Sequence, residues 1–143
     1  MFRFIASLFF LITAVSCINL KYDNVYSISS NTPLTSFACS DGANGLITKY
    51  GVQTTGALAG KLKQGVYLAG SPNVAGWNSP SCGSCYQAVN PSNGKSFLFV
   101  AVDVAHPDVV SGADAFVIAS PNGLAAGSFP IAINPQPVNA CFN

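Results

Sequence analysis

The chain has 143 residues, of which 50% are hydrophobic and only 8% are charged, and its formal net charge is +1. This length fits one domain, and the apolar content supports a packed core rather than a disordered chain. The few basic residues form no stripe that could neutralise phosphates, so nucleic acid is not an expected partner.

Residues 1–17 have the pattern of a secretory signal peptide. Arg3 precedes the apolar run FIASLFFLITAV (4–15), and small residues follow it. This run is shorter than the about 20 apolar residues of a membrane-spanning helix, and no later stretch is long enough either. We expect cleavage between about residues 14 and 17, leaving one secreted domain at 18–143. A bacterial lipoprotein signal is less favoured, because Ala14 stands where a larger aliphatic residue is usual.

The first part of the mature chain predicts two short strands and a short helix. The strands are expected at Leu34–Cys39 and Gly45–Thr48. The segment TTGALAGKL (54–62) predicts the helix, because Thr54 suits the N-cap and lysines near the end suit the negative C-terminus. Its two glycines weaken the helical tendency.

The middle of the chain predicts a strand at 66–68 and then a β-hairpin. The clearest strand is SFLFVAVDV (96–104), which is rich in aromatic and β-branched residues and nearly all apolar. We expect it to be central and covered on both faces. The turn NPSNGK (90–95) precedes it, so CYQAV (85–89) should pair with it.

The last part of the chain predicts a second short helix and two closing strands. The segment SGADAFVIAS (111–120) is the helix candidate and stops before Pro121, although its Phe-Val-Ile run also suits a strand. Strands are expected at 129–133 and 138–141. These elements together predict a small β-rich barrel or sandwich with one or two short helices.

Four cysteines remain after Cys17 leaves with the signal, and in a small secreted chain they predict two disulfides with three possible pairings. Two of them, Cys82 and Cys85, form a Cys-x-x-Cys in the segment GWNSPSCGSCYQ. A redox role is disfavoured because proline, glycine and a β-type run surround the motif instead of a helix N-terminus.

A zinc site would need Cys39 and Cys141 as further ligands, but an exported chain meets an oxidising compartment where such thiols pair. A bond between Cys82 and Cys85 would close a strained small ring. We therefore favour bridges to more distant partners, Cys39–Cys82 and Cys85–Cys141, with no metal and no cofactor.

Charged side chains are so scarce that each is a candidate for function. Asp103 lies inside an apolar run, where a carboxylate must be paired, hydrogen-bonded or facing a cleft; a turn-capping role is equally open. Asp23 and Asp41 stand in turn-like segments, where Asx-turns are common. His106 is the sole histidine, and without a G-x-S-x-G motif a catalytic triad is disfavoured. Trp77 and the tyrosines could stack on sugar rings, but packing is their commoner role.

Five segments together resemble the cerato-platanin family of small secreted fungal proteins. They are KYDNVY, ACSDGANGLITKYG, AGWNSPSCGSCYQ, NGKSFLFVAVDVA and NACFN, in this order. The likeness is dense over residues 22–104 and fades from His106 onward. There the usual DHA is replaced by DVAHP, a longer amphipathic helix is missing, and the tail is rich in proline.

The resemblance implies a mainly-β fold, a six-stranded double-psi β-barrel similar to the first domain of expansins. It implies the two disulfides favoured above and a protein without enzymatic activity. It also implies binding of chitin or other cell-wall oligosaccharides built from N-acetylglucosamine. The residues carried over to the polar groove of the family are Tyr22, Asp23, Asp41, Gly42, Asn44, Gly45 and Asp103.

The leading functional hypothesis is therefore a secreted, wall-associated polysaccharide-binding protein that acts as an elicitor between fungus and host. Its expected partners are wall oligosaccharides, a host plant receptor, and further copies of itself at interfaces. The second hypothesis is a surface-active coat protein without sugar binding. The third is a weak hydrolase that uses Asp23 and Asp103, but a glycosidase needs a tuned carboxyl pair. Trp77 is expected to belong to the scaffold.

Overall fold

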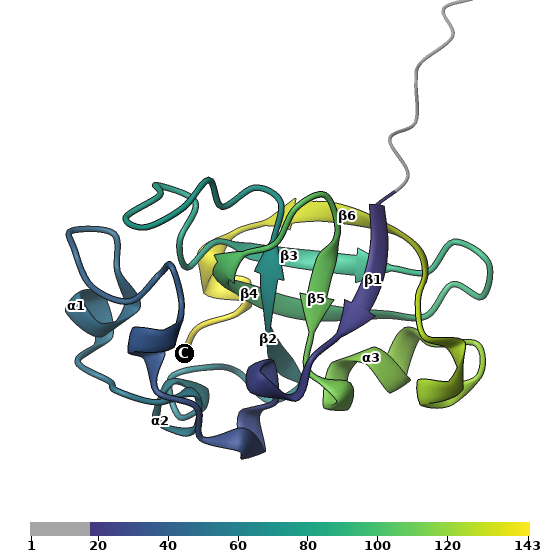
Figure 1. Ribbon diagram of the computed structural model, residues 1–143, viewed down its shortest axis with the longest axis horizontal. Helices are drawn as coiled ribbons and strands as arrows, with labels where there is room; N and C mark the ends of the chain where they lie inside the picture. The colour runs from purple at the N-terminus through teal and green to yellow at the C-terminus, as the bar shows by residue number, and fades with distance from the viewer. Residues whose placement is uncertain (1–17) are drawn as a thin grey trace, which may run out of the picture.

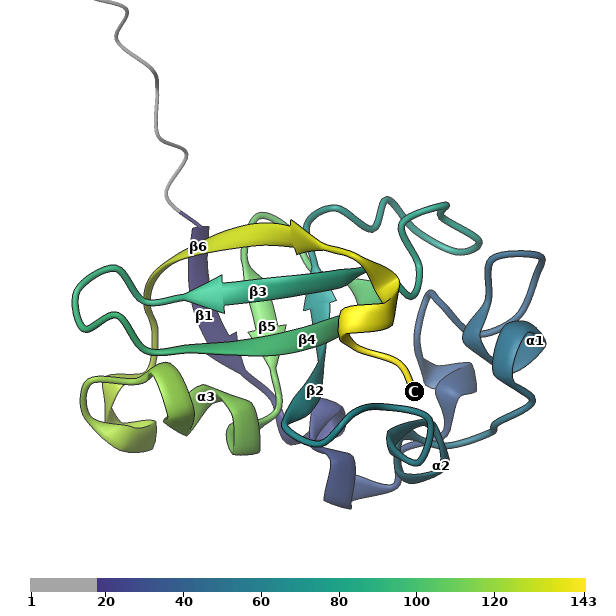
Figure 2. The same ribbon diagram turned by 180° about the vertical axis from the view of Figure 1, so that it is seen from behind.

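The computed structural model describes residues 18–143, and the expected signal peptide and cleavage site lie outside this range. Six strands close into one barrel in the order β1-β5-β2-β4-β3-β6. Figures 1 and 2 show it from opposite sides, with β6, β3 and β4 crossing the front in Figure 2. The strands are β1 (Ile18–Tyr22), β2 (Val66–Ser71), β3 (Cys85–Val89), β4 (Ser96–Val104), β5 (Val109–Ser111) and β6 (Phe129–Gln136). The predicted six-stranded barrel is confirmed.

Three short α-helices and five 3-10 turns connect the strands within residues 18–143. In Figure 1, α1 and α2 lie to the left of the barrel and α3 lies beneath it. The helices are α1 (Leu46–Tyr50), α2 (Thr55–Ala59) and α3 (Ala113–Ala119). The 3-10 turns are η1 (Asn24–Tyr26), η2 (Ile28–Ser30), η3 (Leu34–Ser36), η4 (Gly123–Ala126) and η5 (Val138–Ala140).

Strand β4 is the central strand that its composition predicts. It pairs parallel with β2 and antiparallel with β3, where Cys85 faces Val100. Residues 99–102 are fully buried, so the strand is covered on both faces. The predicted hairpin of β3 and β4 is confirmed, with the turn at residues 90–95 between them.

The proline-rich tail forms a strand because β6 divides its pairing between two neighbours. Residues 129–131 pair with β1, and residues 132–136 pair with β3. No residue of β6 therefore has partner strands on both sides. Pro130 and Pro135, which cannot donate to a ladder, are tolerated there as they are on edge strands.

Both predicted helices are present but shorter than expected. Thr54 caps α2, and its hydroxyl accepts a hydrogen bond from the backbone N–H of Ala57 at 3.2 Å. The helix stops at Gly60, which is a poor helix former. Helix α3 ends at Ala119, ahead of Pro121, as expected.

The strand predicted at Leu34–Cys39 is wrong. Pro33 precedes the turn η3, and the N–H of Phe37 bonds to the carbonyl of Leu34 at 3.1 Å. Leu34 and Phe37 are both buried, and they lie three positions apart, as a turn requires, rather than two. The segment joins β4 through the N–H of Cys39, which donates to the carbonyl of Val102 at 3.1 Å.

The strand predicted at Gly45–Thr48 is also wrong, because helix α1 begins there. Its first N–H groups, those of Leu46 and Ile47, donate to the carbonyls of Cys39 and Ser40, each at 2.9 Å. The preceding loop thus satisfies donors that a helix start leaves free. Five residues of mixed apolar and polar character give too short a pattern to separate helix from strand.

The third wrong strand is the one predicted at Val138–Cys141, which forms the turn η5. Strand β6 ends at Gln136, opposite Cys85. Pro137 follows, and the chain turns back so that Cys141 reaches Cys85 with 5.8 Å between their Cα atoms.

The predicted disulfides are confirmed as Cys39–Cys82 and Cys85–Cys141. Their S–S distances are 2.03 and 1.97 Å, and they close loops with sequence separations of 43 and 56 residues. The first joins the segment before α1 to the loop before β3, and the second joins the start of β3 to the C-terminus. All four cysteines of the described range are used, so none is left to bind zinc.

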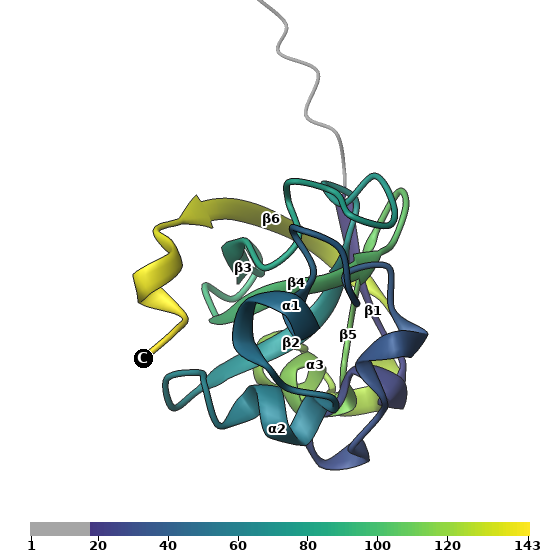
Figure 3. The same cartoon turned by 90° about the vertical axis from the view of Figure 1, so that its left-hand side faces the viewer.

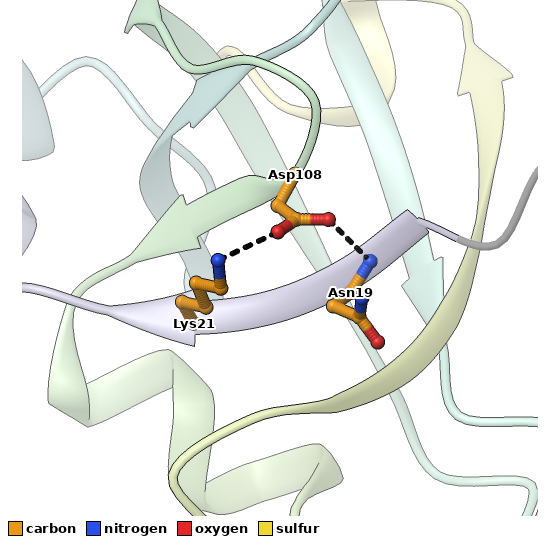
Figure 4. A network of polar contacts seen from close by, with 3 residues as sticks. All are labelled: Asn19, Lys21 and Asp108. Atoms are coloured by element: carbon orange, nitrogen blue, oxygen red, sulfur yellow. Dashed lines mark hydrogen bonds and ion pairs between the residues drawn. The ribbon is translucent and has the colours of Figure 1, made fainter.

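An ion pair between an exposed lysine and a buried aspartate ties β1 to the turn before β5 (Figure 4). Asp108 accepts a hydrogen bond from the backbone N–H of Asn19 at 3.0 Å and lies 2.8 Å from the Lys21 ammonium. The Asp108 side chain is only 10% exposed, whereas that of Lys21 is 53% exposed. The Lys21 contact, followed by the Asn19 N–H, lowers the pKa of Asp108 below its ordinary value.

We expect the double variant Cys85→Ala/Cys141→Ala to lose about 2–5 kcal/mol of unfolding free energy, because the long loop is no longer closed in the unfolded chain. Urea denaturation followed by circular dichroism measures the loss. A variant that unfolds at the wild-type urea concentration would contradict this role of the C-terminal disulfide.

We expect Asp108→Ala to lower the unfolding free energy by roughly 1–3 kcal/mol at neutral pH, since a charged hydrogen-bond acceptor is removed. The folded-state pKa of Asp108 is lowered, so its stabilisation is present above the unfolded pKa of about 4 and is lost as pH falls through the folded value. Denaturation of both proteins from neutral to acidic pH should show the two stabilities converging. Lys21→Met is the control, and we expect it to lower the unfolding free energy by under about 1 kcal/mol. If the difference in unfolding free energy between wild type and Asp108→Ala stays constant as pH falls, Asp108 does not contribute the pH dependence.

Candidate functional site

Asp103 stands at the end of β4 and organises the backbone around it. Its Oδ1 accepts hydrogen bonds from the backbone N–H of Ala38 at 2.8 Å and of Val104 at 2.9 Å. Its Oδ2 accepts one from the hydroxyl of Tyr26 at 2.8 Å. The expectation of a hydrogen-bonded carboxylate is confirmed, whereas Asp103 caps none of the described helices or 3-10 turns.

The carboxylate of Asp103 keeps one acceptor position. A carboxylate has about four lone-pair sites, and three donors occupy Asp103 within the described residues. The open position is on Oδ2, the oxygen that Tyr26 approaches. Because Asp103 is only partly buried, a ligand hydroxyl or amide N–H could reach this oxygen from solvent.

Tyr26 is the buried partner that fixes the Asp103 carboxylate. It is 8% exposed and stacks on Phe37, with ring centroids 5.3 Å apart. Burial raises the pKa of Tyr26 well above its ordinary value, and the Asp103 hydrogen bond and the negative charges of Asp103 and Asp23 raise it further. The hydroxyl thus keeps its proton and donates to Asp103 throughout the physiological pH range.

Tyr22 and Asp23 lie where β1 passes into η1, the 3-10 turn that ends at Tyr26. Asp23 caps η1, its Oδ1 accepting from the N–H of Val25 at 3.0 Å, and its side chain is exposed. Tyr22 is 37% exposed and packs its ring on Phe116 of α3 at 4.8 Å. Asp23 therefore contributes charge beside Tyr26, whereas much of Tyr22 packs on the scaffold.

Asp41 belongs to a second cluster, the Trp77 platform, formed by Asp41, Gly42, Asn44, Trp77 and Asn78. The indole Nε1 of Trp77 donates to Asp41 Oδ1 at 2.7 Å. This hydrogen bond is the main cause that holds the pKa of Asp41 below its ordinary value. Trp77, expected in the scaffold, is 63% exposed.

Gly42, Asn44 and Gly45 shape the loop against this tryptophan. Gly42 has φ of +79°, and a Cβ there would lie 2.8 Å from Asn78 Oδ1. The backbone N–H of Asn44 donates to that same oxygen at 2.9 Å, and the Asn44 side chain donates to the Asn78 carbonyl at 3.0 Å. A Cβ at Gly45 would meet the Asp41 carbonyl at 2.2 Å, so the loop can close only on glycine.

The seven residues carried over to the groove thus fall into two neighbouring groups. Tyr22 and Asp23 shortly precede Tyr26 in the chain, and Asp103 accepts its hydrogen bond. Asp41, Gly42 and Asn44 belong to the Trp77 platform, and Gly45 lies against the backbone of Asp41 in the same loop. The segment from Ala38 to Asp41 connects the groups, because Ala38 bonds to Asp103 and Asp41 to Trp77. Figure 3 looks onto the side of the molecule that carries α1, with the loop between β2 and β3 above it. No enclosed pocket is present in residues 18–143. Asp23, Asp41 and Trp77 are exposed, whereas Asp103 is partly buried and Tyr26 is buried.

Sequence reasoning missed two of the residues that build these groups. Tyr26 appeared only as one aromatic residue among several, although the YDNVY segment placed it three positions after Asp23. Trp77 could have been recognised from its polar neighbours Asn78 and Ser79, since buried tryptophans need apolar surroundings. The hydrogen bonds of both cross 36 or more residues of sequence, which no local pattern reveals.

The described residues contain neither a metal-binding cluster nor a membrane-spanning helix, and their sole histidine is exposed. Between residues 18 and 143, no three His, Cys, Asp or Glu side chains gather as a metal ion would require. His106 is exposed in the turn after β4. None of the helices in this range is long and apolar enough to cross a membrane.

Comparison with known proteins identifies relatives by sequence and by structure. The curated cerato-platanin of Ceratocystis fimbriata f. sp. platani is 36% identical over 93 residues, covering 65% of this chain and 63% of the relative. The crystal structure of cerato-platanin 3 from M. perniciosa has a TM-score of 0.75 at 31% identity, covering 87% of this chain and 98% of the other. The solution structure of the fungal elicitor cerato-platanin has a TM-score of 0.70 at 29% identity, covering 85% and 94%.

The match spans only part of the curated relatives, between 52% and 63% of the length of the first three. The family model for cerato-platanin, however, matches residues 18–127, which is most of the described barrel. With the closed six-stranded fold and both disulfides in place, the chain belongs to the cerato-platanin family.

Proposed function

We propose that the protein is a secreted, non-catalytic protein that binds oligomers of N-acetylglucosamine from chitin and acts as an elicitor at the boundary between fungus and host. The observation that carries the proposal is the partly buried Asp103 carboxylate, whose Oδ2 accepts a single hydrogen bond from the described residues and so keeps an acceptor position. Such an oxygen can accept hydrogen bonds from sugar hydroxyls and acetamido N–H groups. Family membership supports the elicitor role, since a solved relative is the fungal elicitor cerato-platanin.

The surroundings of Asp103 suit binding of a neutral, extended ligand. Asp23 and Trp77 are exposed and Asp103 is partly buried, so a long polymer could lie across the surface that carries them. Tyr26 and the backbone of Ala38 hold the carboxylate in one orientation before a ligand arrives. A rigid acceptor loses little conformational entropy on binding, which favours affinity.

A hydrolytic role is less well supported by the same geometry. The side chain of Asp23 caps η1, and Asp103 is engaged by three donors. A glycosidase needs one carboxyl group to deliver a proton and another to act as nucleophile or base. Both aspartates instead serve as hydrogen-bond acceptors for the scaffold, which favours binding without bond cleavage.

We expect Asp103→Asn to weaken binding of a chitin hexamer by at least about tenfold, because an amide NH₂ replaces the oxygen that accepts from the sugar. Asparagine retains an acceptor for the Ala38 N–H, and its NH₂ can donate to the Tyr26 oxygen, so the fold should persist. Isothermal titration calorimetry measures the affinity, and circular dichroism checks the fold.

Lys95→Gln is the matched control, since it removes an exposed charge next to the opposite end of β4. It should bind like the wild type. A wild-type protein that gives no heat with chitin oligomers would refute the proposed function. Unchanged affinity in Asp103→Asn would refute only the role of Asp103 and leave the proposed function standing.

A surface-active coat protein is the second candidate, favoured by the apolar side chains that remain exposed. The mature chain balances five lysines against five aspartates, so little net charge opposes adsorption. The large exposed hydrophobic residues are Tyr22, Val25, Trp77, Val104, Val117, Leu124 and Val138.

If this candidate is correct, the oxidised mature protein lowers the surface tension of water and forms a film, because its exposed apolar side chains leave water at the interface. Pendant-drop tensiometry measures this. The double variant Val117→Ser/Leu124→Ser should adsorb more weakly, whereas the polar control Lys95→Gln should not. A surface tension equal to that of buffer would exclude the candidate.

A further inference from the structure

Trp77 is the only tryptophan of the chain. Among the large hydrophobic residues between 18 and 143 it is the most exposed. Its side chain is 63% exposed, whereas the largest aromatic residues of folded proteins are usually buried over most of their surface. A large apolar side chain left in water costs free energy that burial would recover. The exposure therefore calls for a reason other than packing.

The exposed indole is held in place at its edge. Its Nε1 donates to Asp41 Oδ1 at 2.7 Å, a short bond to a charged acceptor. Gly42 lies against the other part of the ring, since a Cβ on that residue would stand 3.1 Å from Trp77 Cζ2. These contacts fix the ring at its rim and leave most of its surface open.

The two loops that meet at this ring are themselves fastened together. Asn78, in the left-handed conformation at φ of +58°, accepts from Asn44 through both its side chain and its carbonyl. The disulfide Cys39–Cys82 joins the same two segments a few residues away. The ring is thus preorganised, so a ligand would not have to order it.

The chemistry of this arrangement fits a sugar ring. The flat face of a pyranose is apolar and stacks on an aromatic ring, while its hydroxyl groups project outward around the rim. Asp41 stands at the rim of the indole, where such hydroxyls would arrive. No side chain within residues 18–143 donates to Asp41 Oδ2, so this oxygen is available to accept from a ligand.

We propose that Trp77 is a stacking platform for one pyranose unit of a β-linked oligosaccharide, with Asp41 Oδ2 accepting a hydrogen bond from a hydroxyl of that unit. This inference rests on the proposed function and extends it. The Ala38–Asp41 segment links the platform to Asp103, so a ligand longer than one sugar could contact both.

Fluorescence tests the platform directly, because Trp77 is the sole tryptophan and reports only on its own surroundings. The full mature protein is titrated with a chitin hexamer, excited at the red edge where tyrosine does not absorb, in parallel with calorimetry. We expect the emission to change and to saturate with the calorimetric affinity. Trp77→Ala should weaken binding about 3- to 10-fold, and Trp77→Phe should weaken it less.

Val117→Ala is the matched control, because it removes an exposed apolar side chain from α3 and should leave the affinity unchanged. Calorimetric binding with unchanged Trp77 emission and an unaffected Trp77→Ala variant would overturn the platform and leave the proposed function standing. Absence of any calorimetric heat with the hexamer would overturn both. Circular dichroism of Trp77→Ala separates lost binding from lost structure.

Discussion

The disulfide Cys39–Cys82 places the two surface loops of the candidate site side by side. Cys39 follows the segment whose N–H groups bind Asp103 and β4, and Cys82 follows the loop that carries Trp77. Neither loop belongs to a regular sheet, and a barrel with such long connections depends on covalent closure to limit the entropy of the unfolded chain. This disulfide holds the two loops of the Trp77 platform together, and the end of β4 positions Asp103.

The scarce charged residues of the chain serve structure and surface chemistry together. Asp103 holds Ala38 and Tyr26 in place, and Asp41 orients Trp77, yet each keeps an oxygen that can accept from a ligand. Asp108 is different, because Lys21 and Asn19 use both of its oxygens inside the barrel wall. Asp103 and Asp41 thus differ from Asp108 in their hydrogen-bond partners. The fold fixes the donors to all three carboxylates.

The strands with a strong local pattern, β3, β4, the first half of β2 and much of β6, were predictable, as were α2, α3 and both disulfides. Strands β1 and β5 escaped prediction because they are short and pair in parallel across a long crossover. The segments at Leu34, Gly45 and Val138 resemble strands in sequence because apolar content alone does not distinguish a strand from a single helical turn. For the site, the family resemblance supplies Tyr22, Asp23, Asp41, Gly42, Asn44, Gly45 and Asp103. The roles of Tyr26 and Trp77 depend on hydrogen bonds to residues distant in sequence.

We propose that one face of the protein, from Asp23 through Asp103 to Trp77, binds a chain of N-acetylglucosamine units. Amide chemical-shift mapping of the isotope-labelled mature protein with a chitin hexamer tests it most directly. We expect perturbations at residues 22–26, 38–45, 76–79 and 103–104, together with the indole N–H of Trp77. Perturbations gathered instead on α3 or the turn at residues 90–95, or an unchanged spectrum, would contradict it.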